Sequence, residues 1–159
     1  MALLSVTEFV DSGLRVSDDI RDAEIQLAID TCEKTYIRPL ITKEYYTALV
    51  TSSLSDDDYD VVNGNDDIMG LKMAIAHCVF SYLLYDRIQL TRYSAVIKDD
   101  EHSTDPSEQD IMSVCSNHWE IGIQNVIDAL VTFGHEPSTE LTPQPPFMEL
   151  AFNVYRKGR

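Results

Sequence analysis

The residues best suited to metal binding or nucleophilic chemistry are histidines and cysteines inside two helix-like stretches. Cys115 and His118 stand three positions apart, and His77 precedes Cys78 in the other stretch, so a four-ligand zinc site can be drawn. Consecutive helical residues point about 100° apart, however, so His77 and Cys78 would struggle to share one metal ion. Because the cysteines, including Cys32, are odd in number and far apart, we expect buried, reduced thiols.

A second candidate is the acidic segment 52–67, which is rich in Asp, Ser, Asn and Gly and which we predict to be a solvated loop. It offers many oxygen ligands, but the residue order of a calcium-binding loop is absent. No sequence motif for a hydrolase nucleophile, a metalloprotease, a P-loop or a dinucleotide site occurs. The acids are not paired in an apolar setting. We therefore predict no enzymatic activity, no cofactor and no metal site.

The charge of the chain narrows the classes of partner. Twelve basic residues face 27 acidic ones, for a formal net charge of -15, so the body should repel phosphates and not bind nucleic acid specifically. The most apolar stretch, 73–85, is about half the length of a membrane-spanning helix. The first residues lack the positive region of a secretory signal. We expect neither a membrane anchor nor secretion.

Helical patterns cover most of the first 135 residues. A capping box formed by Ser5 and Glu8 opens the first helix, and Pro39 ends the second. Thr42 can cap the third, and Gly134 is the natural stop of the last. The first helix is expected over about residues 6–12, and the second carries the apolar stripe from Ile25 to Tyr36 and runs to about residue 37. The third carries Tyr45, Tyr46 and Leu49, the fourth covers residues 68–85, and the last opens at Asp105-Pro106.

Two segments depart from helical periodicity. Residues 91–103 alternate in a strand-like way between the two long helices, and residues 136–159 begin with several prolines that favour an extended course. We predict a mainly all-α fold. It comprises a small helical bundle over residues 1–135, a short β-hairpin or extended insertion between its long helices, and an extended C-terminal arm over residues 136–159.

The arm is the predicted partner-binding site. Its apolar residues alternate at period two, which places them on one side of a strand, and an apolar strand beyond a proline-rich lead has little reason to exist unless it docks on another polypeptide. The basic residues at its end either engage acidic surface of a neighbouring subunit or form a solvated tail. The predicted partner-binding residues are Met148, Leu150, Phe152, Val154, Arg156, Lys157 and Arg159.

The order of these elements resembles a known family. The helix that ends in Ile37-Arg38-Pro39-Leu40, followed by Thr42-Lys43-Glu44-Tyr45-Tyr46-Thr47-Ala48-Leu49, is similar to the opening of phage head-tail connector proteins. These are also called adaptor or head-completion proteins. The later helix from Leu71 to His77, the strand-like Thr91 to Val96 and the closing amphipathic helix follow in a similar order. The resemblance covers most of residues 18–133. Within the family, the chain is similar to connector-like proteins of crAss-like and other Bacteroidetes phages.

The resemblance implies a structural virion protein without catalytic residues. It implies a homo-oligomeric ring of about twelve subunits that binds the portal protein and other head-tail or tail proteins. DNA would pass through its channel without specific binding, and an acidic channel wall would leave no site that retains the duplex. The Pro-rich arm after Gly134 departs from the shortest family members.

A different class of function also fits the composition. A small acidic inhibitor, such as a DNA mimic that occupies the basic groove of a nuclease, would carry the same negative charge. It would be a monomer or dimer that forms a tight, salt-sensitive complex with a basic enzyme. Ring formation separates the two hypotheses.

Overall fold

The computed structural model describes residues 2–14, 20–51, 54–93 and 108–138. Over these ranges the chain is mainly helical and contains no strand, which confirms the predicted helical bundle. A π-helical turn, η1 (Glu33–Ile37), and a 3-10 turn, η2 (Arg38–Leu40), connect the second and third α-helices. The α-helices are α1 (Val6–Asp11), α2 (Asp22–Cys32), α3 (Lys43–Thr51), α4 (Asp56–Asn63), α5 (Leu71–Tyr93) and α6 (Glu108–Thr132).

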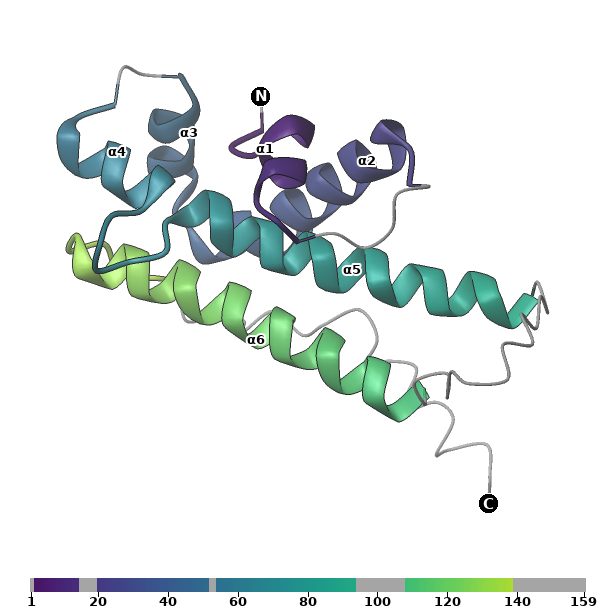
Figure 1. Cartoon of the computed structure of the whole chain (residues 1–159). Coiled ribbons are helices and arrows are strands. Elements are labelled where there is room, and N and C mark those ends of the chain that lie inside the picture. The colour runs from purple at the N-terminus through teal and green to yellow at the C-terminus, as the bar shows by residue number, and fades with distance from the viewer. Residues whose placement is uncertain (1, 15–19, 52–53, 94–107, 139–159) are drawn as a thin grey trace.

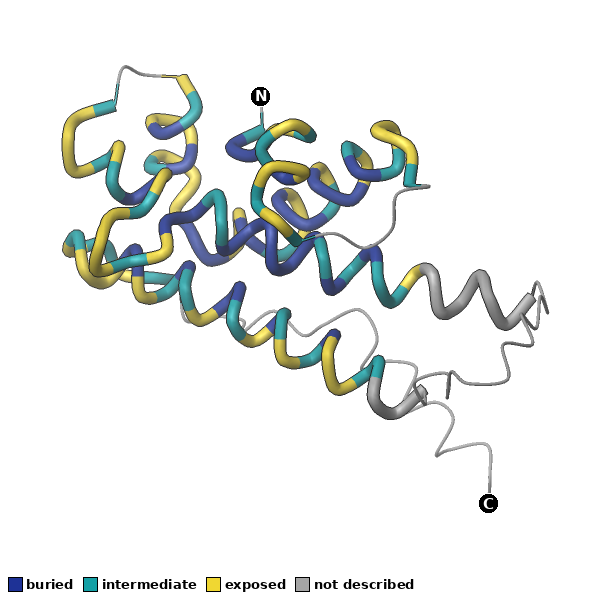
Figure 2. Tube along the Cα trace, in the orientation of Figure 1, coloured by how far each residue is buried: buried dark blue, intermediate teal, exposed yellow. Residues whose placement is uncertain are grey.

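Helix α5 is the centre of the arrangement. It runs alongside α6 on one side and contacts α2 on the other, with α1 packed on α2 (Figure 1). The shorter α3 and α4 gather at the end of the molecule where α5 begins and α6 finishes (Figure 1). The most buried part of the trace lies where α5 meets α2 and α6 (Figure 2). The helix that contains the most apolar stretch of the sequence, 73–85, is therefore the one that its neighbours cover.

The core follows the stripe that the sequence predicts. In α2 the buried positions are Ile25, Ala28, Ile29 and Cys32, at the three- and four-residue spacing of one helical face. Burial of a large aliphatic side chain is worth about 1.5–3 kcal/mol, so these faces account for much of the packing energy. In α5, buried residues on several sides, among them Ala76, reflect a helix covered by more than one neighbour.

Two predicted helix ends are confirmed in atomic detail. The Ser5 hydroxyl accepts from the Glu8 N–H at 3.3 Å while the Glu8 carboxylate accepts from the Ser5 N–H at 2.9 Å, which completes the capping box of α1. At the end of α6, Gly134 has a φ of 78°, its N–H donates to Val131 O, and the His135 N–H donates to Leu130 O. This pair of bonds is a Schellman turn, which needs the left-handed conformation that glycine adopts easily.

The acidic segment 52–67 corrects the sequence-based prediction of a loop, because its middle is the helix α4. The Ser55 hydroxyl accepts from the Asp58 N–H at 3.2 Å and caps the helix, and three aspartates lie in the first turn, where the helix dipole favours negative charge. Val61 and Val62 are buried and attach α4 to the bundle. The aspartates remain on the outside, so the expected acidic surface is present on a helix.

The strand-like insertion is also corrected in part. Thr91 to Tyr93 continue α5 as helix instead of opening a β-hairpin. Helix propagation from a preformed helix adds one hydrogen bond per residue, which outweighs the weak β preference of a short alternating run. Residues 94–103 of the same prediction lie outside the described ranges.

Candidate functional site

The predicted partner-binding residues lie in the part of the arm that the structure does not describe, so none of them is placed. The structure does describe residues 135–138, which are the last residue of the bundle and the first three residues of the arm. We call these four residues the arm root. We therefore describe the arm root first, as the candidate functional site. Two internal centres that stabilise the bundle follow, one around Glu33 and one between α5 and α6.

The arm root is attached to the start of α3. The His135 ring stacks on Tyr45 with centroids 3.7 Å apart, and the Ser138 N–H donates to the carbonyl of Leu40 at 3.0 Å. The Tyr45 hydroxyl in turn donates to Asp58 of α4 at 2.8 Å. Burial, followed by this bond to Asp58, raises the pKa of Tyr45 far above its ordinary value. The chain thus enters the arm from a fixed position between α3, α4 and η2.

The first internal centre surrounds the carboxylate of Glu33, which is only 1% exposed. Its Oε1 accepts from the backbone N–H groups of Leu3 at 2.8 Å and Leu4 at 3.0 Å, and its Oε2 accepts from the Tyr46 hydroxyl at 2.7 Å. The Arg38 guanidinium lies over the Tyr46 ring, 4.5 Å from its centroid. Burial, with Glu33 as acceptor, raises the pKa of Tyr46 to about 12, so this hydroxyl stays a donor.

Glu33 therefore joins three parts of the chain that are far apart in sequence: the N-terminal segment, η1 and α3. A buried carboxylate is expensive unless each of its oxygens is satisfied, and here every bond comes from a donor. Sequence reasoning missed this residue, because a single Glu in an amphipathic helix is normally assigned to the solvent face. Its two backbone donors, the N–H groups of Leu3 and Leu4, are also about 30 residues away.

The second internal centre is the seam between α5 and α6. A Cβ atom added at Gly122 would lie 2.5 Å from the Cys78 Sγ and 2.8 Å from the Ala74 carbonyl oxygen, so glycine is what allows the helices to approach so closely. The Ser81 hydroxyl donates to the Cys115 carbonyl at 2.8 Å and ties the same two helices together. The close approach fixes the register of α5 against α6.

A pair of histidines meets on this seam. His77 and His118 place their Nδ1 atoms 2.8 Å apart with centroids at 4.9 Å, and the Phe80 ring packs against His118 at 4.5 Å. Burial lowers the pKa of both imidazoles, and the neighbouring His118 lowers that of His77 further. The four-ligand zinc site that could be drawn from the sequence combined these two helices, and of its four residues the structure brings only the two histidines into contact through their side chains.

The three cysteines are confirmed as buried thiols. Burial raises the pKa of Cys78 to about 12 and that of Cys115 to about 11, and it raises the pKa of Cys32 strongly as well. Thiols held in the protonated form are poor nucleophiles and poor metal ligands. In the ranges that the structure describes, no three His, Cys, Asp or Glu residues cluster closely enough to hold a metal ion.

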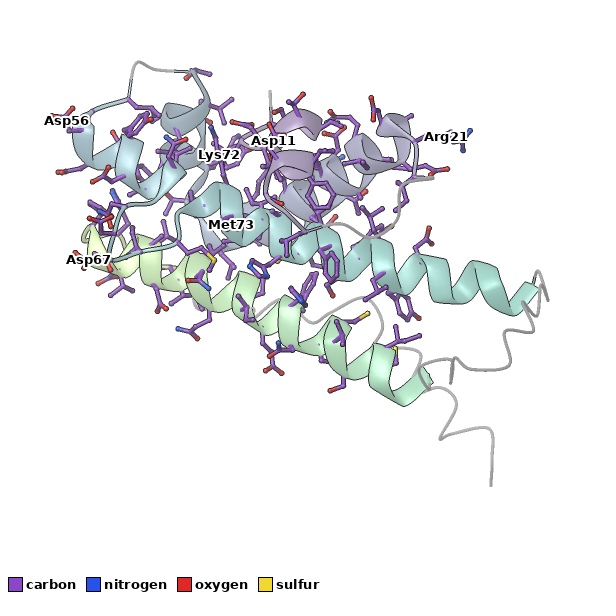
Figure 3. The ribbon with its side chains drawn as sticks, viewed as in Figure 1. Asp11, Arg21, Asp56, Asp67, Lys72 and Met73 are labelled. Atoms are coloured by element: carbon purple, nitrogen blue, oxygen red, sulfur yellow. The ribbon has the colours of Figure 1, made fainter. Side chains whose placement is uncertain are left out.

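Exposed acidic residues lie at the end of the molecule that carries α4. Asp56 and Asp67 point outward there, whereas Arg21 projects from the opposite end beside α2 (Figure 3). Asp57 and Asp66 at the α4 end are exposed as well. The arm root lies against α3 and α4, so the arm begins beside this acidic end. Within the described residues, no helix is long and apolar enough to cross a membrane.

Comparison with protein-family models, with curated proteins and with solved structures found no match to this chain.

Proposed function

We propose that the protein is a structural virion component, one subunit of an oligomeric ring that joins the portal at the capsid vertex to the tail. The ring would form part of the DNA exit channel and would also contact other head-tail proteins. The proposal begins from the order of helices and the Ile37-Arg38-Pro39-Leu40 corner, which resemble those of head-tail connector proteins. The mainly helical bundle is the fold class that this resemblance implies.

The observation that carries the proposal is the position of the arm root. Ser138 is bonded to Leu40, and His135 stacks on Tyr45, so the arm starts against the same corner and third helix on which the resemblance rests. A docking segment gains affinity when its origin is fixed, because less orientational freedom is lost on binding. An arm that begins from a fixed point is suited to reach the same place on every neighbour of a ring.

The charge of the chain supports the same proposal. A ring of subunits that each carry a net charge of -15 would repel the DNA duplex evenly and would let it slide through the channel. The same charge opposes assembly, although salt screens contributions beyond about 8–10 Å. Apolar contacts must outweigh the remaining repulsion. The alternating residues Met148, Leu150, Phe152 and Val154 are the proposed source, by strand addition to a neighbour or to the portal.

The test compares the full chain with a truncation that ends at Ser138, which keeps the arm root intact. Each protein is examined alone and with the portal protein of the same genome, by mass photometry and negative-stain electron microscopy. We expect rings or portal-bound rings from the full chain. The truncated chain should remain monomeric, with the same circular dichroism spectrum and the same Tm.

Matched substitutions separate the apolar face of the arm from its length. Replacing Met148, Leu150, Phe152 and Val154 with serine should abolish assembly, whereas Glu149→Ser with Asn153→Ser on the opposite face should leave it intact. Normal assembly of the truncated chain would exclude arm docking. A full chain that forms no ring, ignores the portal and binds a basic nuclease in a salt-sensitive complex would instead support the acidic-inhibitor hypothesis.

A further inference from the structure

The histidine pair between α5 and α6 takes no part in the proposed arm contact, and its two Nδ1 atoms converge from different helices. His77 is 8% exposed and His118 is half-buried, so the pair lies at the margin of the seam and is not sealed in the core. The Nδ1 atoms are hydrogen-bonded at 2.8 Å, so one ring donates its N–H and the other accepts. A metal ion would take the place of that shared proton, with each ring then protonated at Nε2. Two imidazole nitrogens that converge from different helices can act as a bidentate ligand when both are neutral.

The separation of the nitrogens can be compared with the separations that different coordination geometries require. Two ligands at adjacent corners of a square or octahedron, each about 2.0 Å from the metal, lie about 2.8 Å apart, whereas tetrahedral zinc requires about 3.3 Å. The observed 2.8 Å is the length of the hydrogen bond between the rings, and it is also close to the separation that the right-angled arrangement requires. Nitrogen ligands at right angles are typical of copper(II) and nickel(II) sites.

The seam holds both rings in position. Gly122, one turn after His118, packs against Ala74 and Cys78, and the bond from Ser81 to the Cys115 carbonyl lies on the other side of the pair. Contacts one turn away in both directions prevent the helices from sliding or separating at the histidines. A pre-formed site of this kind loses little free energy to reorganisation when it binds its ligand.

The protonation state also suits a metal ligand. Burial depresses the pKa of both histidines, which keeps the imidazoles neutral near pH 7. The charge that lowers the pKa of His77 on α5 is that of His118 on α6. Among the described residues, no carboxylate contributes to the pKa of either histidine. Cys78 and Cys115, the titratable groups adjacent on the two helices, are protonated thiols.

We propose that His77 and His118 form a two-histidine binding site for a divalent transition metal of the copper(II) or nickel(II) type, with water as the remaining ligands. The bound ion would cross-link α5 and α6. The absence of a third protein ligand among the described residues argues against a closed structural zinc site. The inference does not depend on the proposed virion role.

The experiment uses the full chain with His102→Gln and His135→Gln, which leaves His77 and His118 as its histidines. Nickel(II) is titrated by calorimetry, because it does not oxidise thiols, and copper(II) is added for electron paramagnetic resonance. We expect one ion per chain and a copper spectrum split by two nitrogens. At about 100 times the dissociation constant, the Tm should rise by about 5–10 °C.

A further His118→Gln substitution should weaken nickel binding by about tenfold or more and should leave at most one nitrogen in the copper spectrum. Cys115→Ala is the matched control one turn away and should keep both properties. Should His118→Gln fail to fold, copper-induced broadening of the imidazole ¹⁵N resonances in the parent protein gives the answer. The proposal is overturned by an absence of saturable binding, by broadening that spares His77 and His118, or by binding that depends on Cys115.

Discussion

The centre at Glu33 and the seam at Gly122 both join parts of the chain that are distant in sequence, but they do so by opposite means. Around Glu33 a charged group is buried and each of its oxygens accepts from a donor. At Gly122 the side chain is missing altogether, and the backbones approach until an added methyl group would overlap Cys78. The first centre depends on complete hydrogen bonding, and the second depends on close fit.

This difference indicates which kind of substitution destabilises each region. A hydrogen-bonded centre fails when one partner is removed, since the remaining donors stay buried without an acceptor. A closely fitted seam tolerates removal of atoms better than their addition, because added volume has to push two helices apart. A substitution that removes atoms should therefore be most damaging at Glu33. A substitution that adds atoms should be most damaging at Gly122.

The largest effect is expected for Glu33→Ala. It leaves the Leu3 and Leu4 N–H groups and the Tyr46 hydroxyl without their acceptor and opens a cavity, so we expect a loss of about 3–5 kcal/mol in the free energy of unfolding. Urea denaturation measures the loss, and hydrogen exchange should show the Leu3 and Leu4 amides unprotected. Asp30→Ala, an exposed acid on α2, should cost far less. Equal losses for the two variants would show that Glu33 is not a centre of stability.

An intermediate effect is expected for Gly122→Ala. At an exposed helical position, this change stabilises a protein by up to about 1 kcal/mol, but here the new methyl group meets Cys78 and the Ala74 carbonyl. We therefore expect a destabilisation of about 1–3 kcal/mol by urea denaturation. Adding Cys78→Ala should restore part of it by removing the sulfur. A stabilised Gly122→Ala variant would mean that the helices are not in close contact.

The smallest effect on the free energy of unfolding is expected from a change of pH. It arises at the histidine pair, which lies on the same seam as Gly122. The folded state lowers the pKa of His77 and His118 below the ordinary value of 6.5, so the unfolded chain binds protons first as the pH falls. Their contribution to stability is present above about pH 6.5 and is lost below it. Urea unfolding between pH 8 and 5 should show a steeper decline for the parent than for His118→Gln. Parallel curves would contradict the linkage.

Much of the helical scaffold could be predicted from the sequence, because its signals are local. The capping box at Ser5 and Glu8 and the stop at Gly134 each depend on residues a few positions apart, and both are confirmed. The acidic helix α4 was missed because its aspartates favour loops on average. Their placement in the first turn after Ser55 was the available signal, and it was outweighed by composition.

The internal centres could not be predicted, since they depend on contacts between distant segments. Nothing near Glu33 in the sequence indicates that Leu3 and Leu4 will supply donors. The sequence offered His77 and His118 only as members of a four-ligand zinc site and did not indicate that these two rings alone would meet. Periodicity correctly places these residues in helices and does not determine which neighbour each helix face meets. The arm's partner-binding residues remain a prediction.

The π turn η1 gives the chain one residue more than an ordinary helical turn requires. The Arg38 N–H donates to the Glu33 carbonyl, five positions earlier, and the fully buried Ile37 likewise follows the fully buried Cys32 by five positions instead of four. The turn therefore acts as a phase shift in the backbone, which lets one apolar face continue after an inserted residue. Such a shift allows Glu33 to be buried within an otherwise apolar helical face. The apolar residues that follow it still lie on the same face.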